Sequence, residues 1–411
     1  MLSFKNRENR STKAINQSQI LQAIKIHDLI SRIELSRITD LDPSTVSRAV
    51  RKLQDLGLIK EHRTGKSTGG RRPVMLGLND EEHHIVGIDI GATKIKGVVT
   101  NLLGEVEEEI TQKIEHAEGK YVDISPQSVL RTIDSLLKNY CQNNSGQENI
   151  LGIGIGVHGL VDKEKGISIF APNFGWENVE LQNIVEEKFD LRTYIDNDVR
   201  VMALGEYWFG HGRGVDNLLC VNAGYGVGSG IILSGEVYRG HKSLAGEIGH
   251  TTVEEDGPLC NCGDYGCLET LASGPAIARE VRKYIKRGFD SNINNMVGRE
   301  LDKITGKIVG EAAKKGDELS RQILKQAGNY LGIGISNLVN VLDPEIVLIG
   351  GGVSKSGDLI LSSLKKTVKT KSMFDPPPIK TTKLRDKAGP IGGGVLVMEA
   401  LYSSPEKFFR E

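Results

Sequence analysis

The sequence predicts an α/β chain in which a short N-terminal module of helices and one hairpin precedes two lobes of repeated strand and helix order. Three observations carry this prediction. Residues 15–78 combine helical apolar spacing with two strand-like runs, alternating strands and helices begin at His84, and two glycine-punctuated βββαβα series follow one another. The 411 residues suffice for about two or three domains with large cores. We place their boundaries at 1–80, at 84–195 with the C-terminal helix (about 388–411), and at 196–387.

The N-terminal module is expected to begin with two helices. Apolar side chains recur at helical spacing over residues 16–29 and again over residues 33–38. Beyond a third helix, residues 58–78 contain a strand, a glycine-rich basic turn and a second strand. Helices followed by such a hairpin predict a winged helix-turn-helix.

The third helix is expected over residues 43–56. Asp42 is a good N-cap, Pro43 suits the first helical position because its missing N–H has no partner to lose, and Gly57 ends the last turn. One face carries the apolar residues Val46, Val50, Leu53 and Leu56. The opposite face carries only small and cationic residues: Ser44, Thr45, Ser47, Arg48 and Arg51.

The rest of the chain divides into two series. The first has expected strands at 83–91, 94–101, 104–114, 150–157 and 193–198, with helices at 125–142 and after Asp198. The second has strands within 218–240 and at 345–353, and helices within 273–340, after Ser356 and after Gly394. Two such series predict a duplicated lobe with a cleft between the copies.

Charge is distributed unevenly along the chain. The net charge of -1 combines residues 1–80, which hold 15 Lys and Arg against 8 Asp and Glu for a net charge of +7, with a remainder of net charge -8. Such asymmetry indicates a basic module that meets a polyanion, joined to an acidic body with another role. No run of about 18 apolar residues predicts a membrane span, and the N-terminus lacks the apolar core of a signal peptide. We therefore expect a cytoplasmic protein.

Three of the five cysteines lie close together in a polar, glycine-rich segment. His250, Cys260, Cys262 and Cys267 follow the pattern H-x9-C-x-C-x4-C. Three thiolates and one imidazole suit a closed tetrahedral Zn²⁺ site, which would be structural because no ligand position stays open. The alternative is a set of reduced core cysteines, the role expected for Cys141 and Cys220.

Glycine-rich turns follow strands at matching places in the two series. In the first, Asp89 could reach Mg²⁺ while Gly91, Thr93 and Lys94 face phosphate oxygens. In the second, the equivalent turn contains Gly224 and Gly226, and a later strand ends at Gly351, which could lie against a nucleotide. The alternative is that tight turns between strands use glycine for its backbone freedom.

Polar residues suited to a polyhydroxylated ligand follow strands in both series. They are Asn173, Asn197, Asp198, Glu247, His250 and Glu269. Carboxylates and amides exchange hydrogen bonds with vicinal hydroxyls, as a sugar pocket requires. Asp198 could also be the general base that takes a proton from a sugar hydroxyl. Alternatively, Asp198 is only an N-cap and Glu247 only an exposed carboxylate.

Seven segments, in their order along residues 85–401, resemble the ROK family of repressors, open reading frames and sugar kinases. They are DIGATK, GIGIGVHGLVD, APNFGW, IDND, GYGVGSGII, AGEIGH, and the His and Cys cluster followed by LET. The resemblance implies a duplicated actin-like, ribonuclease H-like fold and a zinc ion held by the cluster. It also implies that the zinc loop 250–267 positions Glu247 and His250 at a sugar, and that Asn173, Asn197, Asp198 and Glu269 contact it.

The N-terminal extension resembles the regulators of this family, the branch of xylose, N-acetylglucosamine and Mlc-type repressors, whose wing ends in a GGRRP-like sequence, here residues 69–73. The kinases of the family lack the extension and usually place Thr where this chain has Tyr225 and Gly where it has Ala92. A phenol ring beside phosphates would crowd them. ATP and Mg²⁺ are therefore expected only if kinase activity is retained, with Asp198 as the catalytic base.

These features predict a sugar-responsive DNA-binding regulator, a repressor of carbohydrate uptake or catabolism genes. The helix over 43–56 would enter the major groove with Ser44, Thr45, Ser47, Arg48 and Arg51, while Lys66, Arg71 and Arg72 of the wing contact the DNA backbone or minor groove. One module has a small footprint, so we expect a homodimer or higher homo-oligomer on a palindromic operator. Sugar would close the cleft and shift the dimer between two arrangements. The alternatives are an ATP-dependent sugar kinase that kept a DNA-binding domain, and an activator; the sequence does not identify the sugar.

Overall fold

The computed structural model describes residues 12–64, 73–114, 124–143 and 149–409. The chain divides into two compact units. The first unit contains the described residues up to Asp198 and those from Pro390 onward, and the second unit contains Val199–Gly389.

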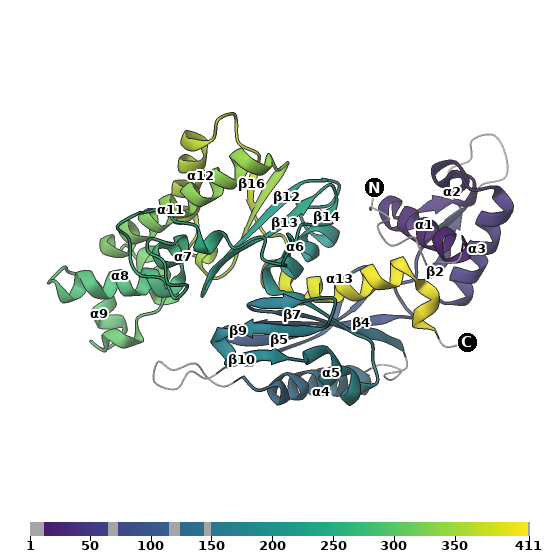
Figure 1. Ribbon diagram of the computed structural model, residues 1–411, viewed down its shortest axis with the longest axis horizontal. Helices are drawn as coiled ribbons and strands as arrows, with labels where there is room; N and C mark the ends of the chain where they lie inside the picture. The colour runs from purple at the N-terminus through teal and green to yellow at the C-terminus, as the bar shows by residue number, and fades with distance from the viewer. Residues whose placement is uncertain (1–11, 65–72, 115–123, 144–148, 410–411) are drawn as a thin grey trace. The chain divides into compact units, whose positions relative to one another are not determined.

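The first unit begins with the winged helix. Its elements are α1 (Thr12–His27), β1 (Ile30–Ser31), α2 (Arg32–Thr39), α3 (Pro43–Asp55), β2 (Ile59–Thr64) and β3 (Val74–Leu78). The three strands form one antiparallel sheet in the order β1-β3-β2. The sequence did not predict β1, whose Ile30 pairs with Leu76, because a strand of two residues has no periodicity. Figure 1 shows the three helices grouped beside this sheet.

The N-terminus of α3 forms as the sequence predicts. The Asp42 carboxylate accepts hydrogen bonds from the backbone N–H groups of Ser44 and Thr45, and Pro43 takes the first helical position. Beyond the helix, Gly57 has φ +68°, a conformation that favours glycine. Four side chains of α3 are buried against the module's core: Val46, Ala49, Val50 and Leu53.

A five-stranded sheet forms the body of the first unit, in the order β11-β7-β4-β5-β6. Its strands are β4 (His84–Gly91), β5 (Lys94–Asn101), β6 (Val106–Lys113), β7 (Ile150–Val157) and β11 (Thr193–Asn197). The first three strands are antiparallel neighbours, whereas β7 and β11 run parallel to β4. Parallel pairing brings the carboxyl ends of β4, β7 and β11 to one edge of the sheet.

Helices cover both faces of this sheet. Figure 1 shows α4 (Pro126–Asn143) and α5 (Leu181–Phe189) on one face and α13 (Ala388–Ser403) on the other. The close approach of α13 requires glycine on the strands it crosses. A Cβ atom on Gly87 would lie 1.9 Å from the Pro390 carbonyl oxygen, and one on Gly154 would lie 1.8 Å from that of Gly393.

A second, small sheet was absent from the sequence prediction. It has the order β10-β9-β8, formed by β8 (Leu160–Asp162), β9 (Ile167–Ala171) and β10 (Trp176–Val179). Between β9 and β10, the short 3₁₀ helix η2 (Pro172–Phe174) carries Asn173. This sheet therefore presents one of the predicted sugar residues.

The second unit contains a sheet of the order β14-β13-β12-β15-β16. Its strands are β12 (Leu218–Ala223), β13 (Val227–Leu233), β14 (Glu236–Val237), β15 (Ile346–Gly350) and β16 (Ile379–Thr381). Its helices are α6 (Asp198–Phe209), α7 (Leu268–Ala272), α8 (Gly274–Lys286), α9 (Ile293–Met296), α10 (Gly306–Lys314), α11 (Glu318–Leu342) and α12 (Asp358–Lys371). Long helices α11 and α12 pack on each other and bury much of the unit's apolar core.

The two large sheets have the same topology. In each, three antiparallel strands in chain order are followed by two further parallel strands on the side of the first strand. This correspondence confirms the predicted duplication of an α/β lobe behind a winged helix-turn-helix. Among the described residues, no helix is both long and apolar enough to cross a bilayer.

Candidate functional site

The face of α3 that points away from the module's core carries the residues predicted to bind DNA. Ser44, Ser47, Arg48 and Arg51 are exposed and Thr45 is half-buried. The hydroxyls of Ser44 and Thr45 donate to the N-cap carboxylate of Asp42, and that of Ser47 donates back to the Pro43 carbonyl within the helix. Arg48 and Arg51 make no ion pair or hydrogen bond through their side chains with the described residues, which leaves two guanidinium groups presented to solvent. The predicted wing contacts, Lys66, Arg71 and Arg72, lie outside the described residues.

A cluster that could hold a metal ion lies in the second unit. His250, Cys260, Cys262 and Cys267 offer four ligand atoms within 4.8 Å of one another. Cys260 Sγ lies 3.6 Å from His250 Nδ1, and Cys262 Sγ lies 3.6 Å from Cys267 Sγ. Ligand atoms around a tetrahedral Zn²⁺, with bonds of about 2.0–2.3 Å, are expected at about 3.5–3.8 Å from one another. The four residues therefore fit zinc in number, chemistry and spacing.

The environments of the thiols differ. Burial raises the pKa of Cys267 to about 12, whereas a hydrogen bond from the backbone of Asp264 lowers the pKa of exposed Cys262 to about 7. Burial also raises the pKa of Cys260. A metal ion at this site must therefore displace protons from two buried thiols, and its affinity should fall in acid.

Polar side chains meet at the carboxyl ends of β7 and β11 in the first unit. Asn173 Nδ2 lies 2.9 Å from Nε2 of His158, and Nδ1 of the same imidazole lies 3.9 Å from Asp198 Oδ2. Asn197 donates from Nδ2 to the Gly159 carbonyl at 3.0 Å. Three predicted sugar residues, Asn173, Asn197 and Asp198, thus belong to one cluster. His158 joins them, and the sequence prediction had missed it.

Asp89 lies at the neighbouring strand end, on β4. Burial, and next the negative charge of Asp198, raise the pKa of Asp89 to about 7, against the opposing effect of Lys96 and Lys94. Two carboxyl groups that repel each other can share a proton, be separated by a cation or meet hydroxyl groups of a ligand.

The other three predicted sugar residues lie in the second unit. Glu269, on α7, accepts a hydrogen bond through Oε2 from the backbone N–H of Val227 at 3.0 Å. It therefore ties the segment after the cysteines to the β12–β13 turn. Glu247 is exposed in the loop before η3 (Ile248–His250), and exposed His250 turns Nδ1 toward Cys260.

The loop that carries Glu247 is held by a buried cation. Arg200 on α6, only 3% exposed, donates to the carbonyls of Ser243 at 2.6 Å and Ala245 at 3.1 Å. Ser229 donates to the Gly246 carbonyl from both its backbone and its hydroxyl. The sequence prediction missed this role, although a single arginine within the apolar run VRVMAL signals a buried charge that requires partners.

The turns predicted to bind phosphate are tight connections between paired strands. Gly91 pairs with Lys94 across a two-residue hairpin that contains Thr93, and Ala223 pairs with Val227 across the turn formed by Gly224, Tyr225 and Gly226. A Cβ atom on Gly226 would lie 2.5 Å from Glu269 Oε2. Gly351 has φ +87°, and its Cβ would lie 2.2 Å from the Ala223 carbonyl. Gly226 and Gly351 thus have structural reasons to be glycine, independent of any nucleotide.

Comparisons with known proteins match the winged helix and the two lobes to two separate family models. Residues 85–400 match the model of the ROK family, and residues 13–72 match a model described as MarR family. The xylose repressor of Caldicellulosiruptor bescii is 37% identical over 399 residues, which are 96% of this chain and 98% of that protein. The glucokinase of Halalkalibacterium halodurans is 36% identical over 321 residues, which are 76% of this chain and 94% of that protein.

Among solved structures, a ROK family transcriptional regulator described as a homologue of the E. coli MLC protein superposes with a TM-score of 0.80. It is 30% identical, and the match covers 95% of this chain and 97% of that one. The winged helix and both lobes therefore recur together in one known regulator. With its family model matched from residue 85 to residue 400 and its similarity to the xylose repressor running along almost the whole chain, the protein belongs to the ROK family.

Proposed function

We propose that the chain is a sugar-responsive repressor that binds DNA through its winged helix and a sugar through its ROK lobes. The observation that carries this proposal is the winged helix itself, whose helix α3 presents Arg48 and Arg51 to solvent. Similarity to a xylose repressor along 96% of the chain supports it. The similarity to a glucokinase covers only 76% of the chain.

In this proposal α3 enters the major groove of an operator. A guanidinium group forms two hydrogen bonds to the edge of a guanine or one ion pair with a phosphate, and Arg48 and Arg51 are available for either contact. Hydroxyls of Ser44, Thr45 and Ser47 lie on the same exposed face and can approach the backbone. Lys66, Arg71 and Arg72 of the wing would add sequence-independent affinity.

The sugar is proposed to bind Asn173, Asn197 and Asp198 in the first unit. Carboxylate and amide groups at strand ends match the polar groups that fix a polyhydroxylated ligand. Glu247, His250 and Glu269 of the second unit are proposed as further contacts. A zinc ion held by His250 and the three cysteines would fix the loop that carries these side chains, and His250 Nε2 would then donate to a hydroxyl.

Operator binding tests the DNA half of the proposal. We expect Arg48→Ala to weaken binding to the chain's operator, found by selection from random duplexes, by about 1–3 kcal/mol, and to reduce its salt dependence if the contact is to phosphate. Lys52→Ala, an exposed cation on the flank of the same helix, is the matched control and should change affinity little. Equal affinities of wild type, Arg48→Ala and Arg51→Ala, measured by fluorescence anisotropy, would remove α3 from the interface.

The alternative is a sugar kinase that kept a DNA-binding domain, with Asp198 as base. Its support is the glucokinase relative and the position of Asp198 as the first residue of α6, beside Asp89. ATP turnover with D-glucose or D-xylose, lost in Asp198→Asn, would favour the kinase.

We propose that the repressor acts as a homodimer on a palindromic operator. Light scattering of the free and the DNA-bound protein tests this oligomeric state.

A further inference from the structure

His158 occupies the turn between β7 and β8, at the centre of the polar cluster of the first unit. Its imidazole contacts two side chains from different segments, Asn173 on η2 and Asp198 at the start of α6. The side chain is 30% exposed, so a ligand can reach it. His158 lies within the segment GIGIGVHGLVD, from which the sequence alone predicts no role for it.

The contact with Asn173 favours one tautomer of the neutral imidazole. An amide nitrogen can only donate, so Asn173 Nδ2, at 2.9 Å, makes Nε2 of His158 the acceptor. In the neutral ring the proton then lies on Nδ1, which faces Asp198 Oδ2 at 3.9 Å. One ring therefore orients an amide and directs a donor toward a carboxylate.

The turn itself is held firmly. Gly159 has φ +96°, and a Cβ atom there would lie 2.2 Å from the Phe170 carbonyl, so only glycine fits. Its own carbonyl accepts from Asn197 Nδ2. The edge of the Phe174 ring packs against the imidazole, with 6.1 Å between the ring centroids. The position of His158 is thus fixed on several sides.

This arrangement turns acceptors toward a ligand. Asn173 and Asn197 both direct their amide nitrogens to protein acceptors, so the oxygen of each amide is the atom left to accept from a ligand, beside the Asp198 carboxylate. Three acceptor groups match hydroxyl donors. They disfavour a sugar that lacks a hydroxyl, or carries a substituent on it, at a contacted position.

We infer that His158 is a positioning and specificity residue of the sugar site, which holds the Asn173 amide and the Asp198 carboxylate so that they accept from neighbouring unsubstituted hydroxyls. This inference rests on the proposed sugar-binding function. Without His158 the Asn173 amide can rotate and offer its nitrogen instead of its oxygen, so discrimination between a hydroxyl and its deoxy counterpart is reduced.

The test measures affinity and selectivity in the full-length protein. The probes are D-xylose, D-glucose and the monodeoxy analogues of each, titrated by calorimetry. His158→Ala is expected to weaken the better parent sugar about tenfold and to reduce its preference over the deoxy analogues by a similar factor. His158→Gln retains a side-chain acceptor and should keep most of the affinity and most of the preference over the deoxy analogues. His211→Ala, an exposed histidine after α6, is the control.

The possible outcomes separate the two claims. If the wild type binds neither parent sugar nor any other of a panel of pentoses and hexoses, the proposed sugar-binding function is wrong. If it binds a sugar and His158→Ala keeps both the affinity and the preference over the deoxy analogues, only the role of His158 is wrong. If His158 were merely structural, His158→Ala would reduce the affinity for all these sugars equally, and His158→Gln would not restore it. This result too would overturn the inference.

Discussion

At the scale of single residues, Arg200 shows how one buried cation can fix a functional loop. Its guanidinium replaces water with the carbonyls of Ser243 and Ala245. We expect Arg200→Met to lower the free energy of unfolding by about 2–3 kcal/mol, because two part-buried carbonyls lose a charged donor. Arg200→Lys keeps the charge with a single donor group and should lose less. Urea unfolding measures both.

Arg287→Met, which removes an exposed arginine at the end of α8, is the control for Arg200→Met and should be nearly neutral. If both substitutions lower the free energy of unfolding equally, Arg200 does not hold the loop. If Arg200 does hold the loop, Arg200→Met should also weaken sugar binding, because the loop carries Glu247. A variant that unfolds more easily yet binds sugar as the wild type does would separate stability from positioning.

Single residues were predictable where local spacing determines their role. His250, Cys260, Cys262 and Cys267 are close enough in sequence for their pattern alone to indicate a metal site. His158 and Arg200 were missed because their partners come from other segments: Asn173 lies two strands further along the chain than His158, and Ser243 lies three strands further along than Arg200. A polar residue directly after a buried strand was the available signal for His158.

At the scale of elements, the zinc loop is the segment that we expect to depend most on a bound metal ion. Within residues 252–267, strand pairing is limited to two isolated bridges, one between Thr252 and Cys267 and one between Leu259 and Tyr265. We expect chelation, or Cys262→Ser at an exposed position, to remove one bound zinc per chain and lower the Tm by several degrees, since about 1 kcal/mol corresponds to about 2–4 °C at this domain size.

Cys141→Ser is the matched control, because Cys141 is half-buried on the other unit and outside the cluster. Zinc content is measured by mass spectrometry of metals and Tm by calorimetry, before and after dialysis against a chelator. A wild-type protein that contains no zinc, or one whose Tm is unchanged by its loss, would contradict the assignment.

Elements were predictable in proportion to their local signals. Helix α3 formed as expected because Asp42, Pro43 and Gly57 mark its ends within its own sequence. The sheet of β8, β9 and β10 was missed because its strands are short and are stabilised by pairing with one another. The duplicated order of the two large sheets could be predicted, because it repeats over many elements and does not depend on any one of them.

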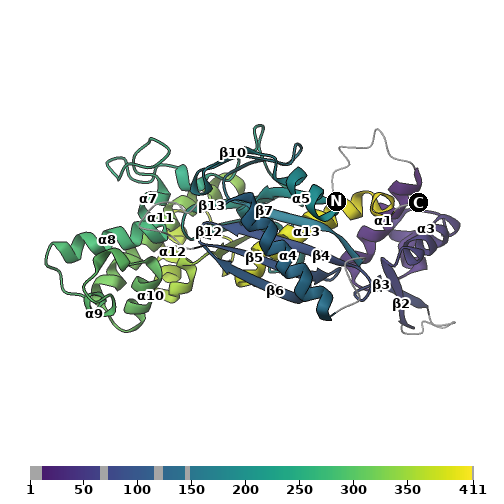
Figure 2. The same cartoon turned by 90° about the horizontal axis from the view of Figure 1, so that it is seen from below.

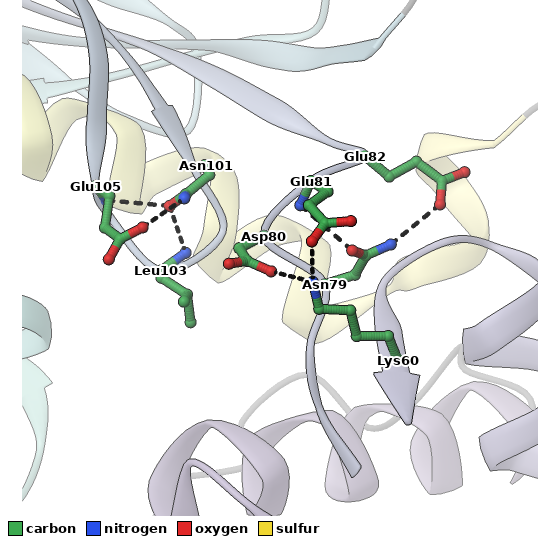
Figure 3. A network of polar contacts seen from close by, with 8 residues as sticks. All are labelled: Lys60, Asn79, Asp80, Glu81, Glu82, Asn101, Leu103 and Glu105. Atoms are coloured by element: carbon green, nitrogen blue, oxygen red, sulfur yellow. Dashed lines mark hydrogen bonds and ion pairs between the residues drawn. The ribbon is translucent and has the colours of Figure 1, made fainter. Parts of the chain in front are cut away.

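At the scale of the whole molecule, the link between the winged helix and the sheet of the first unit matters most. Figure 3 shows Lys60 of β2 facing two acidic residues of the connecting segment, Asp80 at 2.6 Å and Glu81 at 2.7 Å. Hydrogen bonds with these carboxylates, that of Asp80 first, raise the pKa of Lys60, and the Lys60 bond lowers that of Asp80. His83 Nε2 lies 2.7 Å from the Leu56 carbonyl at the end of α3. The connection is therefore held at several points instead of acting as a loose tether.

A second connection runs through the C-terminus. Beyond α13, η7 (Pro405–Phe408) contacts α1 of the winged helix, and Figure 2 shows this end of the chain beside that helix. Phe408 stacks on Tyr194 of β11 with ring centroids 6.5 Å apart, and the Arg192 guanidinium lies 5.6 Å from the Phe408 ring. Phe409 packs against His83 at 5.2 Å. The strand that ends at Asn197 is thereby joined to the DNA-binding module through two aromatic rings.

These contacts predict that Phe408 couples sugar binding to operator binding. Sugar can change DNA affinity only if it binds one arrangement of the chain better than another, and the coupling must be equal in both directions. We expect Phe408→Ala to leave sugar affinity and sugar-free operator affinity within about threefold of wild type, while the loss of operator affinity caused by sugar shrinks at least about fivefold. Phe374→Ala, 79% exposed in the second unit, is the control. Anisotropy titrations with and without saturating sugar give the ratio, and an unchanged ratio in Phe408→Ala would mean that the coupling takes another route, with the linker at Lys60 and Asp80 the next to test.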